Sequence, residues 1–116
     1  MLDTAHFNLA RIRLSAEQAT ALLRTLAHEE RLLLLCQISQ QELCVGELEQ
    51  QLGIHQPMLS QHLGVLRRQG LVNTRRDGKR IYYHIADARA LTLLHTLYAL
   101  YCDHETVTTM ENKING

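Results

Sequence analysis

Apolar residues near the start of the chain recur every three or four positions, which is the spacing of one helix face. This spacing predicts a helix over residues 16–28, with Ser15 as its N-terminal cap. Residues 1–14 show no clear period and are expected to form an N-terminal arm. A second helix is expected to begin at Glu29, because carboxylates favour the first turn of a helix. The run RLLLLCQI that follows is apolar on nearly every side, as in a buried helix.

Two shorter helices are expected after a polar turn at residues 39–44. Val45 opens a short third helix that should end at Gly53, a residue typical of helix C-termini. Pro57 fits the first turn of a fourth helix, which should end at Gly70. Three leucines at helical spacing would form the inward face of this fourth helix: Leu59, Leu63 and Leu66.

After the fourth helix the pattern changes from helical to strand-like. Residues 71–76 and 80–85 are rich in β-branched and aromatic side chains, and Asp77-Gly78 between them is a strong hairpin signal. Asp87 is then expected to cap a last long helix. The pattern therefore predicts a fold that is mainly α with a small β-hairpin, in the order α-α-α-α-β-β-α.

Composition and length describe one small globular domain. The chain has 116 residues, of which 46% are hydrophobic, and this is enough for one domain spanning residues 1–116. Residues 106–116 are polar and are expected to form a flexible tail. The sequence shows no secretion signal and no apolar run of membrane-spanning length. A cytoplasmic protein with no membrane partner is expected, in a compartment where thiols stay reduced.

The charge of the chain is balanced overall but uneven along it. Formal net charge is +0, and a basic balance is the usual mark of a nucleic-acid-binding protein. However, one short stretch is strongly basic and contains a single acid, Asp77. A local basic patch on a neutral protein still attracts phosphate. Its members are Arg67, Arg68, Arg75, Arg76, Lys79 and Arg80.

A short helix, a turn, a second helix and a basic hairpin together predict a winged helix-turn-helix. The fourth helix would enter the major groove, where glutamine and serine bond base edges and glutamine can pair with adenine through a two-bond fork. The hairpin would form a wing on the phosphates. His62 either faces the groove or packs beneath the helix, and Arg67 either meets phosphate or is a solvated residue. The candidate DNA-binding residues are Gln56, Met58, Ser60, Gln61, His62, Arg67, Arg76, Lys79 and Arg80.

The run VGELEQQLGIHQPMLSQHLGVLRRQGLVNTRRDGKRIYYHI resembles the core of ArsR/SmtB-family winged helix-turn-helix repressors. The resemblance covers about residues 15–102. It implies a homodimer formed through the first and last helices, which presents two recognition helices to palindromic double-stranded operator DNA. It also implies repression that is relieved by an inducer.

Two of the three cysteines extend this resemblance. Cys36 in LLLLCQI and Cys102 in LYALYC are similar to the thiols of the dithiol (BigR/SqrR-like) persulfide- and redox-sensing branch. In that branch the two thiols become linked by a disulfide or a polysulfide chain, and DNA is released. The resemblance thus implies that Cys36 and Cys102 sense a reactive sulfur species or an oxidant. On its residues alone, a cysteine in an apolar helix is equally a small buried hydrophobe.

Metal-responsive repression is the main alternative. Arsenic, cadmium and lead sensors carry a run similar to ELCVCDL, but this chain has Cys44 followed by Gly46 where the second cysteine would be. At the zinc or nickel site of the family, Asp87 matches but Arg89 replaces the first histidine. Three further possible ligands are off the expected spacing: His95, His104 and Glu105. No metal and no cofactor is therefore expected.

Other classes of function fit the sequence less well. It has no nucleophile elbow, no paired-carboxylate motif and no phosphate-binding glycine loop, so an enzyme is not expected. A constitutive DNA-binding protein without an inducer and a winged helix used for protein contacts stay open as alternatives.

Overall fold

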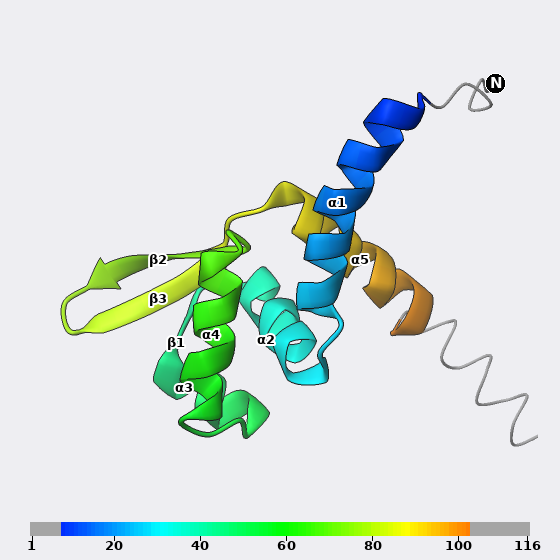
Figure 1. Ribbon diagram of the computed structural model, residues 1–116. Helices are drawn as coiled ribbons and strands as arrows, with labels where there is room; N and C mark the ends of the chain where they lie inside the picture. Colours follow the sequence, from blue (N-terminus) through cyan, green and yellow to red (C-terminus); the bar gives the residue numbers. More distant parts are fainter. Residues whose placement is uncertain (1–7, 103–116) are drawn as a thin grey trace, which may run out of the picture.

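The computed structural model describes residues 8–102. The hairpin projects from one side of the helical body, and the start of α1 and the end of α5 project from the other (Figure 1). This order of helices and hairpin confirms the predicted winged helix-turn-helix, with one short strand added. The elements are α1 (Leu9–Leu26), α2 (Glu29–Gln40), β1 (Leu43–Cys44), α3 (Val45–Leu52), α4 (Met58–Arg68), β2 (Val72–Asp77), β3 (Arg80–Ile85) and α5 (Ala88–Tyr101).

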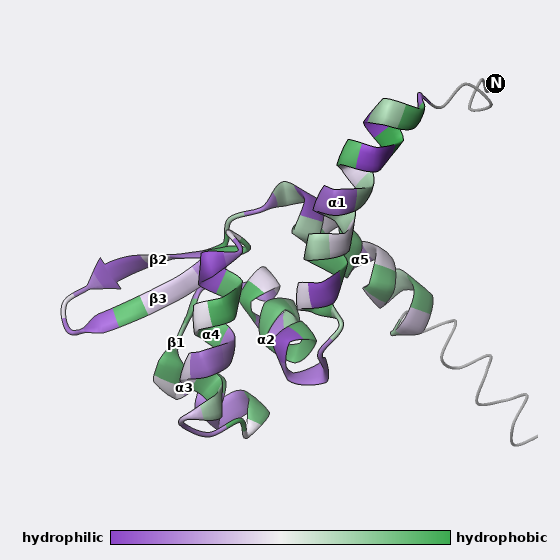
Figure 2. Ribbon diagram, viewed as in Figure 1, coloured by the Kyte–Doolittle hydropathy of each residue, from purple (hydrophilic) through white to green (hydrophobic). Residues whose placement is uncertain are grey.

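Leucine side chains from several helices fill the core. Leu34 and Leu35 of α2 are fully buried, and α2 contacts α1, α3, α4, α5 and β3. The three leucines predicted to face inward from α4 are all buried. Figure 2 shows the contrast between the hydrophobic α5 and the hydrophilic end of β2. None of the helices in residues 8–102 is both long and apolar enough to cross a bilayer.

The sheet has three antiparallel strands in the order β1-β3-β2. Leu43 and Cys44 of β1 pair with Tyr83 and Tyr82 of β3. The prediction of a turn over residues 39–44 is therefore wrong at both ends. Ser39 and Gln40 still belong to α2, and the last two residues form a strand that is too short to show alternation. This short strand ties the start of α3 to the base of the hairpin.

The hairpin turn lies one residue later than predicted. Asp77 pairs with Arg80, so the two turn residues are Gly78 and Lys79. Gly78 has a φ of 64°, which glycine adopts without the steric cost that a side chain would bring. The shift places Lys79 at the tip of the wing.

Helix α1 begins well before the expected position, and the prediction of an arm over residues 1–14 is wrong from Leu9 onward. The side chain of Asn8 caps the helix, because its Oδ1 accepts a hydrogen bond of 3.1 Å from the Arg11 backbone N–H. Leu9 and Leu14 are each 61% exposed, so no buried stripe marks this part of the helix in the sequence. The predicted tail at residues 106–116 lies outside the described residues.

Helix α5 begins at the predicted position, but the rest of the protomer covers only its N-terminal half. The Asp87 Oδ1 accepts hydrogen bonds from the backbone N–H groups of Arg89 (2.8 Å) and Ala90 (3.4 Å). The side-chain hydrogen bond from Arg89 is the main cause that lowers the pKa of Asp87. Leu94 is buried, whereas Tyr98 and Tyr101 are 59% and 72% exposed. The C-terminal half of α5 therefore presents an apolar face that this protomer does not cover.

Candidate nucleic-acid interface and thiol pair

Helix α4 has one buried face and one open face, as a recognition helix requires. Its leucines fix the inward face, and Met58, Ser60 and Gln61 lie exposed at the opposite face of the first turns. Arg67 is exposed in the last turn. These four predicted DNA-binding residues are therefore accessible to a ligand.

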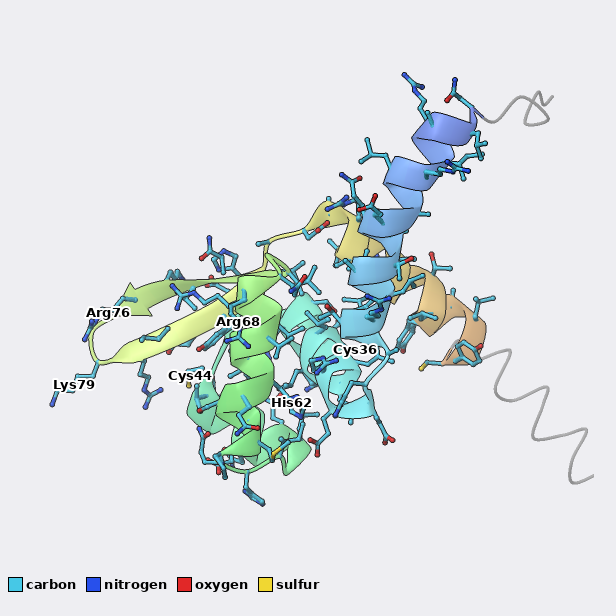
Figure 3. The ribbon with its side chains drawn as sticks, in the orientation of Figure 1. Cys36, Cys44, His62, Arg68, Arg76 and Lys79 are labelled. Atoms are coloured by element: carbon cyan, nitrogen blue, oxygen red, sulfur yellow. The ribbon has the colours of Figure 1, made fainter. Side chains whose placement is uncertain are left out.

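His62 takes the packed position instead of the groove position. It is only 4% exposed, and its Nε2 lies 2.9 Å from the Glu30 Oε1 at the start of α2. Its ring also packs against that of His28, with 4.5 Å between the ring centroids. The prediction that His62 contacts DNA is wrong, because its position on α4 turns it toward α2 (Figure 3). It fixes the recognition helix to the core.

Gln56 precedes α4 and caps it through its side chain. Its Oε1 accepts a hydrogen bond of 3.1 Å from the Ser60 backbone N–H and one of 2.5 Å from the Ser60 hydroxyl. Pro57, at the cap position itself, offers no side-chain hydrogen bond. Gln56 thus supplies the acceptor that the first turn of α4 needs.

The basic residues of the wing differ in their surroundings, since two lie toward the tip (Figure 3) and Arg75 is paired near the base. Arg76 and Lys79 lie toward the tip, far from the helical body (Figure 3). No ion pair joins Lys79 to any residue between 8 and 102. Arg75 differs, because its Nε donates to the Glu42 Oε1 at 2.6 Å and its guanidinium lies 4.9 Å from the centroid of the Tyr82 ring. The cations near the tip are therefore available to phosphate, whereas Arg75 stabilises the base of the wing.

Two of the cysteines lie on helices that contact each other, one on α2 and one at the end of α5. Cys36 is half-buried on α2, and Cys102 is exposed at the C-terminal end of α5. Burial raises the pKa of the Cys36 thiol, and the charge of a Cys102 thiolate raises this pKa further. The fold thus brings a Cys102 thiolate, 66 positions away in sequence, close enough for its charge to add to burial in raising the pKa of Cys36.

A cavity of about 420 Å³ opens beside Cys36, between α2 and α5. Its wall combines polar side chains of α2 with Leu94, His95 and Tyr98 of α5. A small reagent can therefore approach the Cys36 sulfur from this cavity.

Cys44 lies apart from this pair and serves the fold. It is buried at the start of α3, where its backbone N–H donates a 3.0 Å hydrogen bond to the Glu47 Oε1. This bond, followed by one from the Cys44 thiol, lowers the pKa of Glu47. Within residues 8–102, no three histidine, cysteine or acidic side chains are placed to hold a metal ion. His104 and Glu105 lie outside the described residues.

Comparison with known proteins identifies the family. Residues 28–74 match the model of the bacterial regulatory proteins of the arsR family. The chain is also 47% identical to the Biofilm growth-associated repressor of Agrobacterium fabrum over 104 residues, which cover 90% of this chain and 89% of that protein. The chain belongs to the ArsR family.

Solved structures of several transcriptional regulators have the same fold. The transcriptional repressor BigR from Xylella fastidiosa superposes with a TM-score of 0.76 at 46% identity, covering 83% of this chain and 98% of BigR. Reduced HlyU from Vibrio cholerae superposes with a TM-score of 0.77 at 39% identity, covering 79% of this chain and 97% of HlyU. A homodimeric winged helix-turn-helix domain from Mycobacterium bovis superposes with a TM-score of 0.69 at 27% identity, covering 85% of this chain and 92% of that domain.

Several contacts of this ArsR-family site could not be found from the sequence. Glu30 and His62 are 32 positions apart, and Glu42 and Arg75 are 33 positions apart. No local pattern signals such pairs, since only the packing of α2 against α4 and of the loop before β1 against the hairpin brings them together. The two acids in the first turn of α2 looked equivalent in sequence, but among residues 8–102 Glu30 has a buried partner and Glu29 has none.

We expect Glu30→Ala to lower the free energy of unfolding by about 1–2 kcal/mol, because it leaves the buried His62 ring without its acceptor. Glu29→Ala is the matched control, since both carboxylates favour the same helix end. Urea unfolding of the two variants at equal protein concentration measures the difference. Equal losses would show that the bond to His62 contributes nothing to stability.

We expect Lys79→Gln to weaken binding to any duplex, because the lysine at the wing tip would neutralise a phosphate. The plot of log affinity against log salt should become shallower by about 0.9 for each phosphate that is no longer neutralised. Arg24→Gln, which removes an exposed charge from α1, is the control and should leave the slope unchanged. Fluorescence anisotropy with a random-sequence duplex gives both slopes, and an unchanged slope for Lys79→Gln would exclude this residue from the interface.

Proposed function

We propose that this protein is a homodimeric transcriptional repressor that leaves its operator when Cys36 and Cys102 become linked by a reactive sulfur species or an oxidant. The observation that carries the proposal is the thiol pair itself. Cys36 lies on α2 and Cys102 at the end of α5, two helices that contact each other. A cavity between these helices opens beside Cys36, and the charge of a Cys102 thiolate adds to burial in raising the pKa of Cys36. The exposed face of α4 and the basic wing supply the DNA-binding surface.

Exposed apolar residues on α1 and α5 support a homodimer. Leu9, Leu14 and Leu23 of α1 are 61%, 61% and 55% exposed, and Leu100 of α5 is 59% exposed. Such a face is stabilised when a second copy covers it. The M. bovis relative is itself described as homodimeric. A dimer of this kind would present two α4 helices to successive major grooves, with half-sites about 34 Å apart.

Repression is the direction of control that relatives support best. The proteins from Agrobacterium fabrum and from Xylella fastidiosa strain Temecula1 are named repressors and are 47% and 50% identical to this chain. HlyU of Vibrio cholerae, at 40% identity, is named a transcriptional activator. We therefore assign repression to the reduced protein.

The linking chemistry needs one thiolate that attacks first and a second that completes the bridge. Cys102 is exposed, whereas burial and the neighbouring charge raise the pKa of Cys36, so Cys102 attacks first. With hydrogen peroxide, the Cys102 thiolate attacks one oxygen, the O–O bond breaks, and the products are a sulfenic acid (S–OH) on Cys102 and hydroxide. The Cys36 thiolate then attacks the Cys102 sulfur and displaces a second hydroxide to form the S–S bond. With a persulfide, Cys102 takes the terminal sulfur and a thiolate leaves, and Cys36 then displaces hydrosulfide.

Helix α2 connects Cys36 to the two helices of the DNA-binding unit through hydrogen bonds. Glu30 at one end of α2 holds His62 of α4, and the Gln37 Nε2 next to Cys36 donates a 2.7 Å hydrogen bond to the Gln51 Oε1 of α3. A bridge between α2 and α5 would therefore move both helices of the DNA-binding unit relative to the α5 face of the dimer. Because operator half-sites demand a set spacing, such a movement weakens binding.

We expect a persulfide donor to release the reduced wild-type protein from promoter DNA taken upstream of its own coding region. Cys36→Ser and Cys102→Ser should stay bound, because neither can form the bridge. Cys44→Ser is the matched control and should be released like the wild type. Fluorescence anisotropy measures release, and mass spectrometry shows whether Cys36 and Cys102 are linked and how many sulfur atoms the bridge contains. Wild-type protein that stays bound after treatment would refute the dithiol switch.

We expect iodoacetamide to alkylate Cys102 before Cys36 in the reduced protein. The Cys102→Ser variant removes a negative charge that raises the pKa of Cys36, so this pKa should fall. At a fixed pH between about 7 and 9, a larger fraction of Cys36 is then thiolate, and its alkylation should be faster. Mass spectrometry measures the alkylation rate of each cysteine and so tests this order. Cys44→Ser is the control variant, in which the rate at Cys36 should match that of the wild type. An unchanged pH profile for Cys36 would show that the two thiols are not coupled.

A further inference from the structure

We infer that Gln56 and Ser60 form a preset hydrogen-bonding unit that reads guanine, rather than adenine, at one base pair of each half-site. The inference rests on the proposed operator binding and adds its base specificity. It starts from the two hydrogen bonds that turn the Gln56 side chain back onto the first turn of α4.

The hydrogen-bond partners of Gln56 fix the orientation of its amide. A backbone N–H can only donate, so the Gln56 atom 3.1 Å from the Ser60 nitrogen has to be the oxygen, Oε1. The Ser60 hydroxyl also reaches this oxygen, at 2.5 Å, and donates its proton there. The chemistry of the partners thus decides which end of the amide is oxygen and which is nitrogen.

The orientation of the amide decides which groups remain for DNA. With Oε1 occupied, the free end of Gln56 is its Nε2, which carries two donors and no acceptor. The fork between glutamine and adenine needs the glutamine oxygen to accept from adenine N6 while the nitrogen donates to N7. Gln56 cannot make this fork without releasing Ser60. Guanine presents two acceptors, N7 and O6, and both match a group that only donates.

The bond between Gln56 and Ser60 is expected to persist in the DNA complex. Pro57 supplies no side-chain cap, so the Gln56 oxygen is the acceptor for the Ser60 N–H at the helix start. Breaking the bond would leave this N–H without a partner against a base edge. Gln61 differs, since its exposed side chain makes no hydrogen bond within residues 8–102 and keeps both a donor and an acceptor. The adenine fork predicted for glutamine is therefore open to Gln61 and closed to Gln56.

The test compares two charge-matched variants on a randomised duplex library. Gln56→Glu keeps the oxygen that caps Ser60 but replaces the outward donor with a second oxygen. Gln61→Glu makes the same chemical change at a side chain without an internal bond. We expect the reduced wild-type protein to select a motif with guanine at one base pair per half-site. Gln56→Glu should lose that guanine, and Gln61→Glu should retain it.

A modified base then tests the contact directly. In the selected duplex, 7-deazaguanine removes the N7 acceptor at that position and leaves base pairing intact. Wild-type affinity should fall about tenfold, and Gln56→Glu affinity should not change. Circular dichroism checks that the variants keep their helical content.

The possible outcomes distinguish a failure of the guanine assignment from a failure of the proposed operator binding. If the wild-type protein selects no motif at all, sequence-specific operator binding fails. If it selects a motif but Gln56→Glu changes no position, or changes one that carries adenine, the guanine assignment is overturned and operator binding stands.

Discussion

Helix α2 is buried on several faces, and each functional part of the described chain packs against it. Leu34 and Leu35 are fully buried and Ile38 is 2% exposed, so the helix has no room to shift alone in a close-packed core. It carries Cys36 near its middle, holds α4 through Glu30 and bonds α3 through Gln37. A chemical change at Cys36 therefore acts on an element that cannot move without moving the DNA-binding helices.

The same constraint explains why a neutral chain can bind a polyanion. The helical body fixes where the wing projects, and β1 ties that wing to the start of α3. Cations concentrate toward the tip, where Asp77 is the single acid of the basic stretch, and Glu42 at the base is paired with Arg75. Net charge says little here, because phosphate meets the local field of the tip and not the average of the chain.

Much of the fold could be predicted because the spacing of hydrophobic residues indicates which side chains are buried. The inward leucines of α4, the hairpin and the Asp87 cap followed from local pattern alone, and the structure confirms them. The pattern failed where burial was absent or the element was too short. The first turns of α1 expose Leu9 and Leu14 to solvent in this protomer, and β1 has only two residues. His62 was ambiguous for a different reason, because a polar side chain on a buried face needs a partner that only the tertiary structure reveals.

The candidate site was less predictable than the fold, and the three cysteines show why. Cys36 in an apolar helix and Cys44 in a turn are each interpreted from sequence as small buried residues, whereas Cys102 lies at a mixed, partly polar helix end. Cys44 fits that description, since it caps α3 through Glu47. Cys36 fits it only in part, because it is half-buried beside a cavity, and the charge of a Cys102 thiolate at the end of α5 adds to burial in raising its pKa. This effect of one thiol on the other depends on the contact between α2 and α5, so the cysteines and their neighbours in sequence cannot reveal it.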